Sequence, residues 1–184
     1  MASNTITDDG QITRDARSRY KLRAEDGAHG AFEAETRRNG SAPRTEVTIE
    51  QAAPPANVAA LIGGDAQVVV RSRKLYSGDR LVQLADTYIP AEVAAAAPAV
   101  AQVDTGVGGI ISRMKDAGFE QTEVIEDVTL NTVTSAEAEA LGVSDGSPVL
   151  TITHVAKTAA GQVVEVTVHK LGAGWTLRYA VPLD

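Results

Sequence analysis

Two arginines, Arg71 and Arg73, stand two positions apart in a stretch rich in valine. Because successive side chains of a strand point to opposite faces, this spacing places both guanidinium groups on one face. Two guanidinium groups repel one another unless an anion lies between them, and arginine is suited to bidentate recognition of phosphate or carboxylate groups. The pair indicates an anion-binding site; the alternative is a solvated cationic strip shared with Lys74 and Arg80.

A glycine-rich segment directly precedes an expected helix over residues 109–117. The amino end of a helix presents free N–H groups and the positive end of the helix dipole, which favours anions. Glycines let the backbone approach a ligand closely, so this segment is a second candidate for anion binding. Its candidate residues are Thr105, Gly106, Gly108 and Gly109. The alternative is an ordinary loop in which Thr105 or Asp104 caps the helix.

Polar residues alternate along two further expected strands. The strand that follows the arginines carries Gln83 and Thr87 on one face, as neutral hydrogen-bonding candidates. A later strand places Glu165, Thr167 and His169 on one face in the same way. For Gln83 and Thr87 the alternative is an exposed strand residue, and for His169 it is a surface or half-buried histidine without a ligand.

The amino-terminal arm offers two more candidates, Phe32 and Glu33, which would close a pocket from outside the sheet. Phe32 could equally anchor the arm to the core. His29 and His154 have no partner pattern, so the sequence assigns them structural roles only.

The charge balance argues against nucleic-acid binding by this chain alone. The 184 residues carry 17 Lys and Arg against 24 Asp and Glu, a net charge of −7. Seven positive and seven negative side chains balance up to residue 38, which leaves ten positive and seventeen negative from Arg44 onward. A free-standing DNA-binding protein is normally basic, because phosphate contacts dominate its affinity.

The sequence lacks the residues and motifs that several kinds of site require. Cysteine is absent and only three histidines are present, so we expect no disulfide, no thiolate nucleophile and no metal site. The sequence contains no G-x-S-x-G elbow and no P-loop, so we expect no catalytic residues and no cofactor. No apolar run approaches the ~20 residues of a membrane span. The polar, uncharged start is unlike a signal peptide, which places the protein in the cytoplasm.

The periodicity of apolar residues predicts an α+β fold with about six strands, mostly antiparallel and joined by hairpins, and flanking helices. Helices are expected over residues 56–61, 109–117 and 135–141, the last capped by Ser135. Strands are expected over residues 45–50, 66–76, 81–89, 119–131, 150–157, 163–170 and 175–181. Residues 1–13 are expected to be a disordered tail or linker remnant, and residues 14–184 to form one domain.

Several segments, in this order, resemble the UTRA domain family. They are GAFEAE (30–35), VRSR (70–73), LADTYIP (84–90), TGVGGI (105–110), SAEAEALG (135–142), GSPVL (146–150) and VVEV (163–166). No single motif is specific, but the ordered set is, and it extends over residues 14–184.

The resemblance implies a chorismate-lyase-like fold and a role as the effector-binding and dimerisation domain of a GntR-type regulator of the HutC subfamily. It implies that Arg71 and Arg73 line the effector pocket and often meet a phosphate or other acidic group. It also implies that Glu165 contacts the ligand. Many relatives that bind sugar phosphates carry a glutamate where this chain has Ala85, which weakens any assignment of an amino-sugar phosphate as effector.

The same resemblance implies a homodimer that senses a small acidic metabolite, phosphorylated or carboxylated. DNA would be bound by an amino-terminal winged helix-turn-helix, for which this sequence has no room before Arg14. We therefore expect a truncated chain; the alternative is a natural stand-alone domain. Two alternatives remain at this stage. One is a chorismate-lyase-like enzyme, and the other is a dimerisation module with a vestigial pocket.

Overall fold

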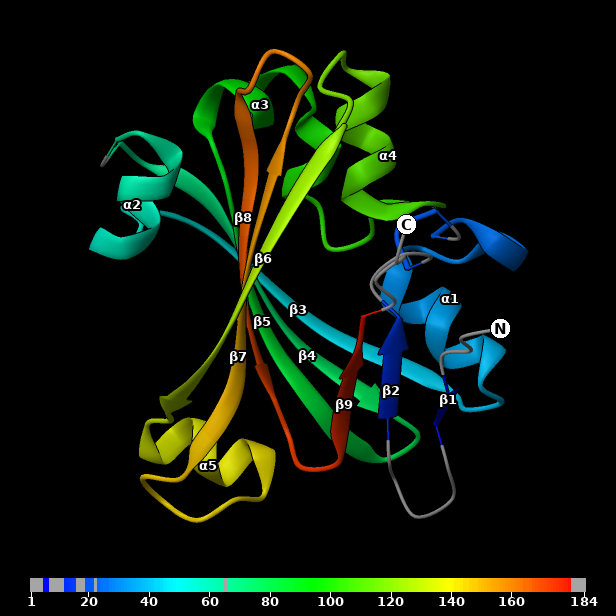
Figure 1. The fold of residues 1–184 in the computed structure, drawn as a ribbon. Coiled ribbons are helices and arrows are strands. Elements are labelled where there is room, and N and C mark those ends of the chain that lie inside the picture. Colours follow the sequence, from blue (N-terminus) through cyan, green and yellow to red (C-terminus); the bar gives the residue numbers. More distant parts are fainter. Residues whose placement is uncertain (1–4, 7–11, 16–18, 22, 65, 180–184) are drawn as a thin grey trace, which may run out of the picture.

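The centre of the protein is a six-stranded antiparallel sheet, strongly twisted (Figure 1). The computed structural model describes residues 5–6, 12–15, 19–21, 23–64 and 66–179. The strands in spatial order are β3 (Pro43–Ala52), β4 (Val68–Ser77), β5 (Arg80–Ile89), β8 (Val163–Leu171), β7 (Pro148–Lys157) and β6 (Glu123–Thr132). The predicted α+β class and the antiparallel hairpins are therefore confirmed.

Short helices cover the two ends of the sheet (Figure 1). One end carries α2 (Ala56–Ile62), α3 (Ala91–Ala96), the 3-10 turn η2 (Pro98–Ala101) and α4 (Gly109–Asp116), and the other carries α5 (Ser135–Leu141). The cap expected at Ser135 is instead Thr134, whose hydroxyl accepts the Glu137 N–H while the Glu137 carboxylate accepts the Thr134 N–H. This reciprocal pair is a capping box, and it makes Ser135 the first helical residue.

A second, three-stranded sheet lies beside the main one. Its order is β1 (Thr5–Ile6), β2 (Ile12–Asp15) and β9 (Trp175–Arg178), and β2 runs parallel to β9. The last predicted strand is therefore not part of the main sheet. Most of the tail predicted over residues 1–13 lies outside the described residues; the described parts, Thr5–Ile6 and Ile12–Thr13, are strand.

The segment between β2 and β3 contains two elements that the sequence did not predict. They are η1 (Glu25–Gly27) and α1 (Ala31–Arg38). Both lie against the side of the main sheet that also faces β2 and β9 (Figure 1). Within the described part of the chain, no helix is long and apolar enough to cross a membrane.

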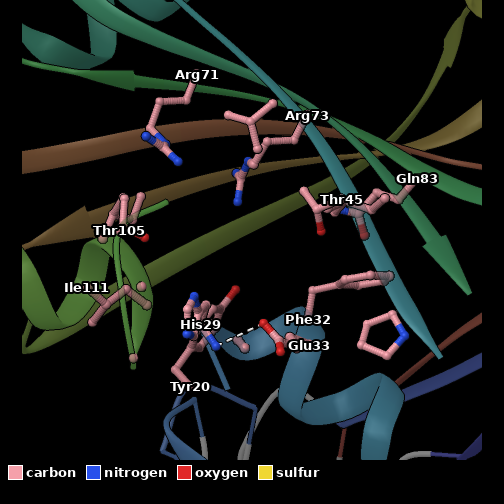
Figure 2. Close-up of a pocket in the computed structure, with 18 of the residues that line it drawn as sticks. Tyr20, His29, Phe32, Glu33, Thr45, Arg71, Arg73, Gln83, Thr105 and Ile111 are labelled. Carbon is pink, nitrogen blue, oxygen red and sulfur yellow. Dashed lines mark hydrogen bonds between the residues drawn. The ribbon is translucent and has the colours of Figure 1, made fainter. Parts of the chain in front are cut away.

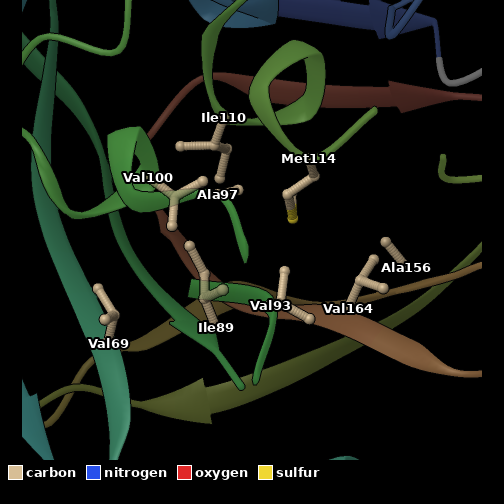
Figure 3. Close-up of a cluster of buried hydrophobic side chains, with 9 residues drawn as sticks. All are labelled: Val69, Ile89, Val93, Ala97, Val100, Ile110, Met114, Ala156 and Val164. Carbon is tan, nitrogen blue, oxygen red and sulfur yellow. The ribbon is translucent and has the colours of Figure 1, made fainter. Parts of the chain in front are cut away.

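One face of the main sheet changes character along its strands. At the end covered by α3, η2 and α4 it is apolar and forms a buried cluster (Figure 3). The members of this cluster are Val69, Ile89, Val93, Ala97, Val100, Ile110, Met114, Ala156 and Val164. Further along the same strands the face carries polar side chains, beginning with Arg71 two residues after Val69. The apolar cluster thus fixes the helices that border the polar half of the face.

Replacing Met114 by alanine tests this anchoring. The Met114 side chain is fully buried, so its removal leaves a cavity between α4 and the sheet. We expect a loss of about 2–5 kcal/mol in the free energy of unfolding, measured by chemical denaturation. Leu130→Ala, at a side chain that is 67% exposed, is the control and should change stability by less than about 0.5 kcal/mol. Equal effects would contradict the packing described here.

Candidate functional site

The polar half of this sheet face forms one wall of a cavity of about 380 Å³ (Figure 2). The opposite side is formed by two segments. One is the amino-terminal wall, the described residues between 19 and 33; the other is the glycine loop, residues 103–109, with the start of α4. The volume suits a small metabolite, since ligand pockets typically measure about 300–1,000 Å³.

Most of the site residues predicted from the sequence line this cavity. They are Phe32, Glu33, Arg71, Arg73, Gln83, Thr105, Gly108, Gly109, Glu165 and His169. Thr87 and Gly106 do not line it. Thr87 is fully buried and accepts a hydrogen bond from Arg73.

Arg71 holds the segment that leads from η2 into the glycine loop. Its Nη1 donates to the carbonyl oxygens of Val100, at 2.6 Å, and of Gln102, and its Nη2 donates to that of Val103, at 3.3 Å. Only 3% of the residue is exposed, so it does not belong to a solvated cationic strip. Burial and the neighbouring Arg73 lower the pKa of Arg71 to about 10, which leaves it charged at neutral pH. Arg71 therefore holds the loop in place and carries positive potential into the cavity.

Arg73 points into the cavity from the same strand and keeps more of its donors free (Figure 2). Its Nη2 donates to the Thr87 hydroxyl, whose oxygen lies 2.7 Å from that of Thr167. Its Nε is buried without a hydrogen-bond partner in the described part of the chain. Burial lowers the pKa of Arg73, and the negative charge of Glu165 opposes that effect. Arg73 makes no ion pair within 4.0 Å among the described residues, so an anion in the cavity would find a partly unsatisfied guanidinium.

Glu165 lies at the edge of the cavity and is 5% exposed. Its Oε1 accepts the Thr167 hydroxyl at 2.8 Å, and its Oε2 accepts the Gln121 amide at 3.0 Å. The carboxylate is thus held by neutral donors rather than by a cation, and its charge balances part of the arginine charge nearby.

The glycine loop differs from the predicted set of free backbone donors. The N–H groups of Gly106, Gly108 and Gly109 donate to Asp104 Oδ1, the Ala28 carbonyl and the Gly106 carbonyl. These groups therefore shape the loop and are not open to a ligand. Gly109 is required for a steric reason, because a Cβ there would lie 2.8 Å from the His29 carbonyl oxygen and φ is +67°.

Gln83 and His169 form a neutral polar floor to the cavity. Arg14 Nη2 donates to Gln83 Oε1 at 2.8 Å, so the Gln83 amide nitrogen is the donor to His169 Nδ1 at 2.7 Å. This assigns the imidazole proton to Nε2. Burial, with the positive charges of Arg19 and other neighbours, lowers the pKa of His169 well below its ordinary value. His169 is therefore uncharged at neutral pH.

Several lining residues were missed by the sequence analysis, among them Arg19, Tyr20, His29 and His154. The Tyr20 hydroxyl donates to Glu126 Oε1 at 2.5 Å and lies 3.0 Å from His154 Nδ1. His154 could have been found only with the strand register, which pairs it with Thr167 on the polar face. Arg19 and Tyr20 precede an unpredicted helix, so no signal placed them at the sheet.

At the mouth of the cavity, the amino-terminal wall is joined to the glycine loop. His29 Nδ1 lies 2.8 Å from Asp104 Oδ1, and Glu33 Oε2 accepts the His29 N–H at 2.9 Å. The N–H of Gly106 and the side chain of His29 lower the pKa of Asp104. Phe32 faces the cavity from α1 (Figure 2). In the described part of the chain, no group of histidine and acidic residues could hold a metal ion.

The neutral state of His169 predicts a pH dependence of stability. Because its pKa is lowered in the folded state, the unfolded chain takes up a proton first as the pH falls below about 6.5. This contribution to stability is complete above pH 6.5 and is lost below it. We expect His169→Gln to remove about 1 kcal/mol of the decrease in unfolding free energy between pH 7 and pH 5.5. Denaturant titrations at both pH values measure it, and identical decreases in the two proteins would contradict the assignment.

The fold is similar to that of several solved transcriptional regulators. A protein described as a GntR-family transcriptional regulator has a TM-score of 0.77 at 19% identity, covering 100% of this chain and 71% of its own. The ligand-binding domain of a GntR-family regulator from Bordetella bronchiseptica has a TM-score of 0.59 at 18% identity. This match covers 77% of the present chain and 91% of that domain. The effector domain of PhnF from Mycobacterium smegmatis has a TM-score of 0.67 at 15% identity. This match covers 84% of the present chain and 96% of that domain.

No curated protein matches the sequence. The sequence model of the UTRA domain does match it, over residues 38–171, which is more than half of the 184 residues and includes every strand of the main sheet. The chain therefore belongs to the UTRA domain family, and its fold is that of the effector-binding domains of GntR-family transcriptional regulators.

Proposed function

We propose that the cavity binds a small acidic metabolite and that this binding is the signal sensed by the domain. A UTRA domain with this fold serves as the effector-sensing part of a transcriptional regulator. The observation that carries the proposed ligand chemistry is Arg73, a cavity-lining guanidinium with a buried, unpartnered Nε and no described carboxylate within ion-pair distance. An arginine held in this way favours carboxylate or phosphate, because it can donate two parallel hydrogen bonds.

The remaining polar groups support an anion that also carries hydrogen-bonding substituents. Thr105 belongs to the glycine loop, whose first residue is bonded to Arg71 through the Val103 carbonyl. Gln83 and His169 contribute neutral polar groups to the cavity lining. Glu165 offers an acceptor for a hydroxyl or amine of the ligand. Thr87 acts indirectly, because its hydroxyl orients Arg73 from behind. The glycines act on the shape of the loop rather than as ligand donors.

The amino-terminal wall suggests how binding would be communicated. A ligand in the cavity would touch both the main sheet and the described residues between 19 and 33, on the side of the chain where a DNA-binding domain would be attached. Binding shifts a conformational equilibrium only if the ligand prefers one of its states, so the wall must differ between the states. DNA recognition itself would belong to a separate winged helix-turn-helix, as in a HutC-type repressor.

We infer no catalytic role for this cavity. The fold is shared with chorismate lyase, but the structural relatives are regulators, and the buried polar groups are arranged to hold an anion. A vestigial pocket is disfavoured because a guanidinium, an imidazole and a carboxylate stay buried around the cavity. When the protein is incubated with chorismate, the chorismate should remain unconverted.

Replacing Arg73 by alanine tests the proposed ligand class. We expect the affinity for inorganic phosphate and for small carboxylates, measured by calorimetry, to fall about tenfold to a hundredfold, because a charge-assisted hydrogen bond is lost. The matched control is Lys74→Ala, which removes a positive charge one position away on the opposite, exposed face of β4. Unchanged anion affinity in Arg73→Ala, together with a lower melting temperature, would show that Arg73 is only structural.

We also propose that the domain is a homodimer, since a regulator that reads two DNA half-sites needs two-fold symmetry. Light scattering at tens of micromolar protein should give twice the chain mass of 19.2 kDa. A monomer mass at that concentration would count against the dimer without affecting the ligand site.

A further inference from the structure

A third arginine lines the cavity, and it comes from the opposite side. Arg19 belongs to the amino-terminal wall, lies outside the residues matched by the family model, and is only 4% exposed. Its Nε and Nη1 are buried without a hydrogen-bond partner among the described residues. Its guanidinium carbon lies 5.4 Å from the centre of the Tyr20 ring. In Figure 2, Tyr20 lies across the cavity from Arg71 and Arg73.

Three carboxylates act on the charge of Arg19, and each of them also contacts another residue. Glu35 Oε2 lies 3.8 Å from Arg14 Nε, although Glu35 Oε1 has no hydrogen-bond partner among the described residues. Glu126 accepts a hydrogen bond from Tyr20 beside His154. Glu165 accepts from Thr167 and Gln121, as described above. These charges favour the cationic form of Arg19 from a distance, although burial disfavours it. None lies within 4.0 Å of its guanidinium in the described structure, so they stabilise the charge without saturating its donors.

Arg19 and Arg73 therefore place like charges on two walls of one small cavity. Each guanidinium has an unpartnered buried nitrogen, and the charge of Arg19 contributes to the lowered pKa of Arg73. Burial and the positive charges of both arginines lower the pKa of His169, so this residue is neutral. The two guanidinium groups repel one another, and the buried nitrogens without a hydrogen-bond partner keep donors that a ligand could use.

We propose that the ligand is a dianion with an acidic group at each end, one bound by Arg73 and the other by Arg19. The connecting part of the molecule passes Gln83 and His169, which donate and accept hydrogen bonds without adding charge. This inference rests on the proposed anion-sensing function and narrows its ligand to dicarboxylates or phosphocarboxylates. It also gives the second acidic group a mechanical role, because that group ties the amino-terminal wall to the main sheet.

The test compares diacids with their monoamides on the wild-type protein, so that it does not depend on the folding of a variant. The probes are malonate, succinate, glutarate, adipate and phosphoglycolate, the monoamides of the four dicarboxylates, and inorganic phosphate, each titrated by calorimetry at pH 7. We expect at least one dicarboxylate of suitable length to bind about tenfold to a hundredfold more tightly than its monoamide, because a second charge-assisted hydrogen bond is formed.

Variants assign the second charge to its residue. Arg19→Gln should reduce the preference for the diacid to near one, because it weakens diacid binding much more than monoamide binding, whereas Arg73→Gln should weaken both. Lys21→Gln is the matched control, because Lys21 is an exposed cation two residues along the same wall. Arg19→Lys, which keeps the charge and loses the planar fork, should retain part of the preference and serves where Arg19→Gln unfolds.

Two outcomes would overturn the inference in different ways. If monoamides bind as tightly as diacids and depend on Arg73 alone, the dianion is wrong while the anion site at Arg73 stands. If neither phosphate nor any acid binds the wild-type protein, the proposed anion-sensing function is wrong as well, and Arg19 is a structural counter-charge for Glu35 and Glu126.

Discussion

Charged and polar side chains buried on a sheet face must find partners, and this constraint shapes the protein around the cavity. The face that carries Val69 and Ile89 at one end carries Arg71, Gln83 and His169 further along. Leaving a buried polar group unpaired costs about 1–3 kcal/mol, so this half of the face cannot be closed by an apolar layer. It is closed by loop carbonyls, by amides and by the amino-terminal wall, which together leave a cavity rather than a core.

The two arginines that share a face have different tasks, and position along the strand decides which task each has. Arg71 is next to the apolar cluster, where the chain leaving η2 presents three carbonyl oxygens to its guanidinium. Arg73 is one pleat further on, opposite Ala85 in the register of β5. A glutamate at that position would pair with Arg73, whereas the methyl group of Ala85 leaves its charge to the cavity.

The strand alternation in the sequence was enough to predict the polar face, since period-two spacing fixes which side chains share a side. It correctly grouped Gln83 with Thr87, and Glu165 with His169. The alternation could not predict that Thr87 is fully buried, because this depends on its pairing with Thr167 on the neighbouring strand β8. The free donors expected from the glycine loop were wrong for two reasons. The N–H groups of Gly106 and Gly109 are bonded within the loop itself, and that of Gly108 is bonded to the Ala28 carbonyl, about 80 residues away, which leaves no local pattern. The same limit hid His154 and Arg19.

The amino-terminal wall belongs to no strand of the main sheet, yet it forms part of the cavity. It is fixed at its start by β2, which pairs in parallel with β9, and by Arg14, which packs 4.4 Å from the Trp175 ring and donates to Gln83. It is fixed at its end by α1 against β3. Between these anchors the wall makes polar contacts, among them Tyr20 with Glu126 and His29 with Asp104. Polar contacts exchange with water and ligand at lower cost than an apolar core repacks. A ligand that engages Arg19 and Arg73 together would therefore stabilise one position of the wall relative to the sheet. Because the wall follows β2 in the chain, a change in its position would also act on β2 and on the segment toward the amino terminus.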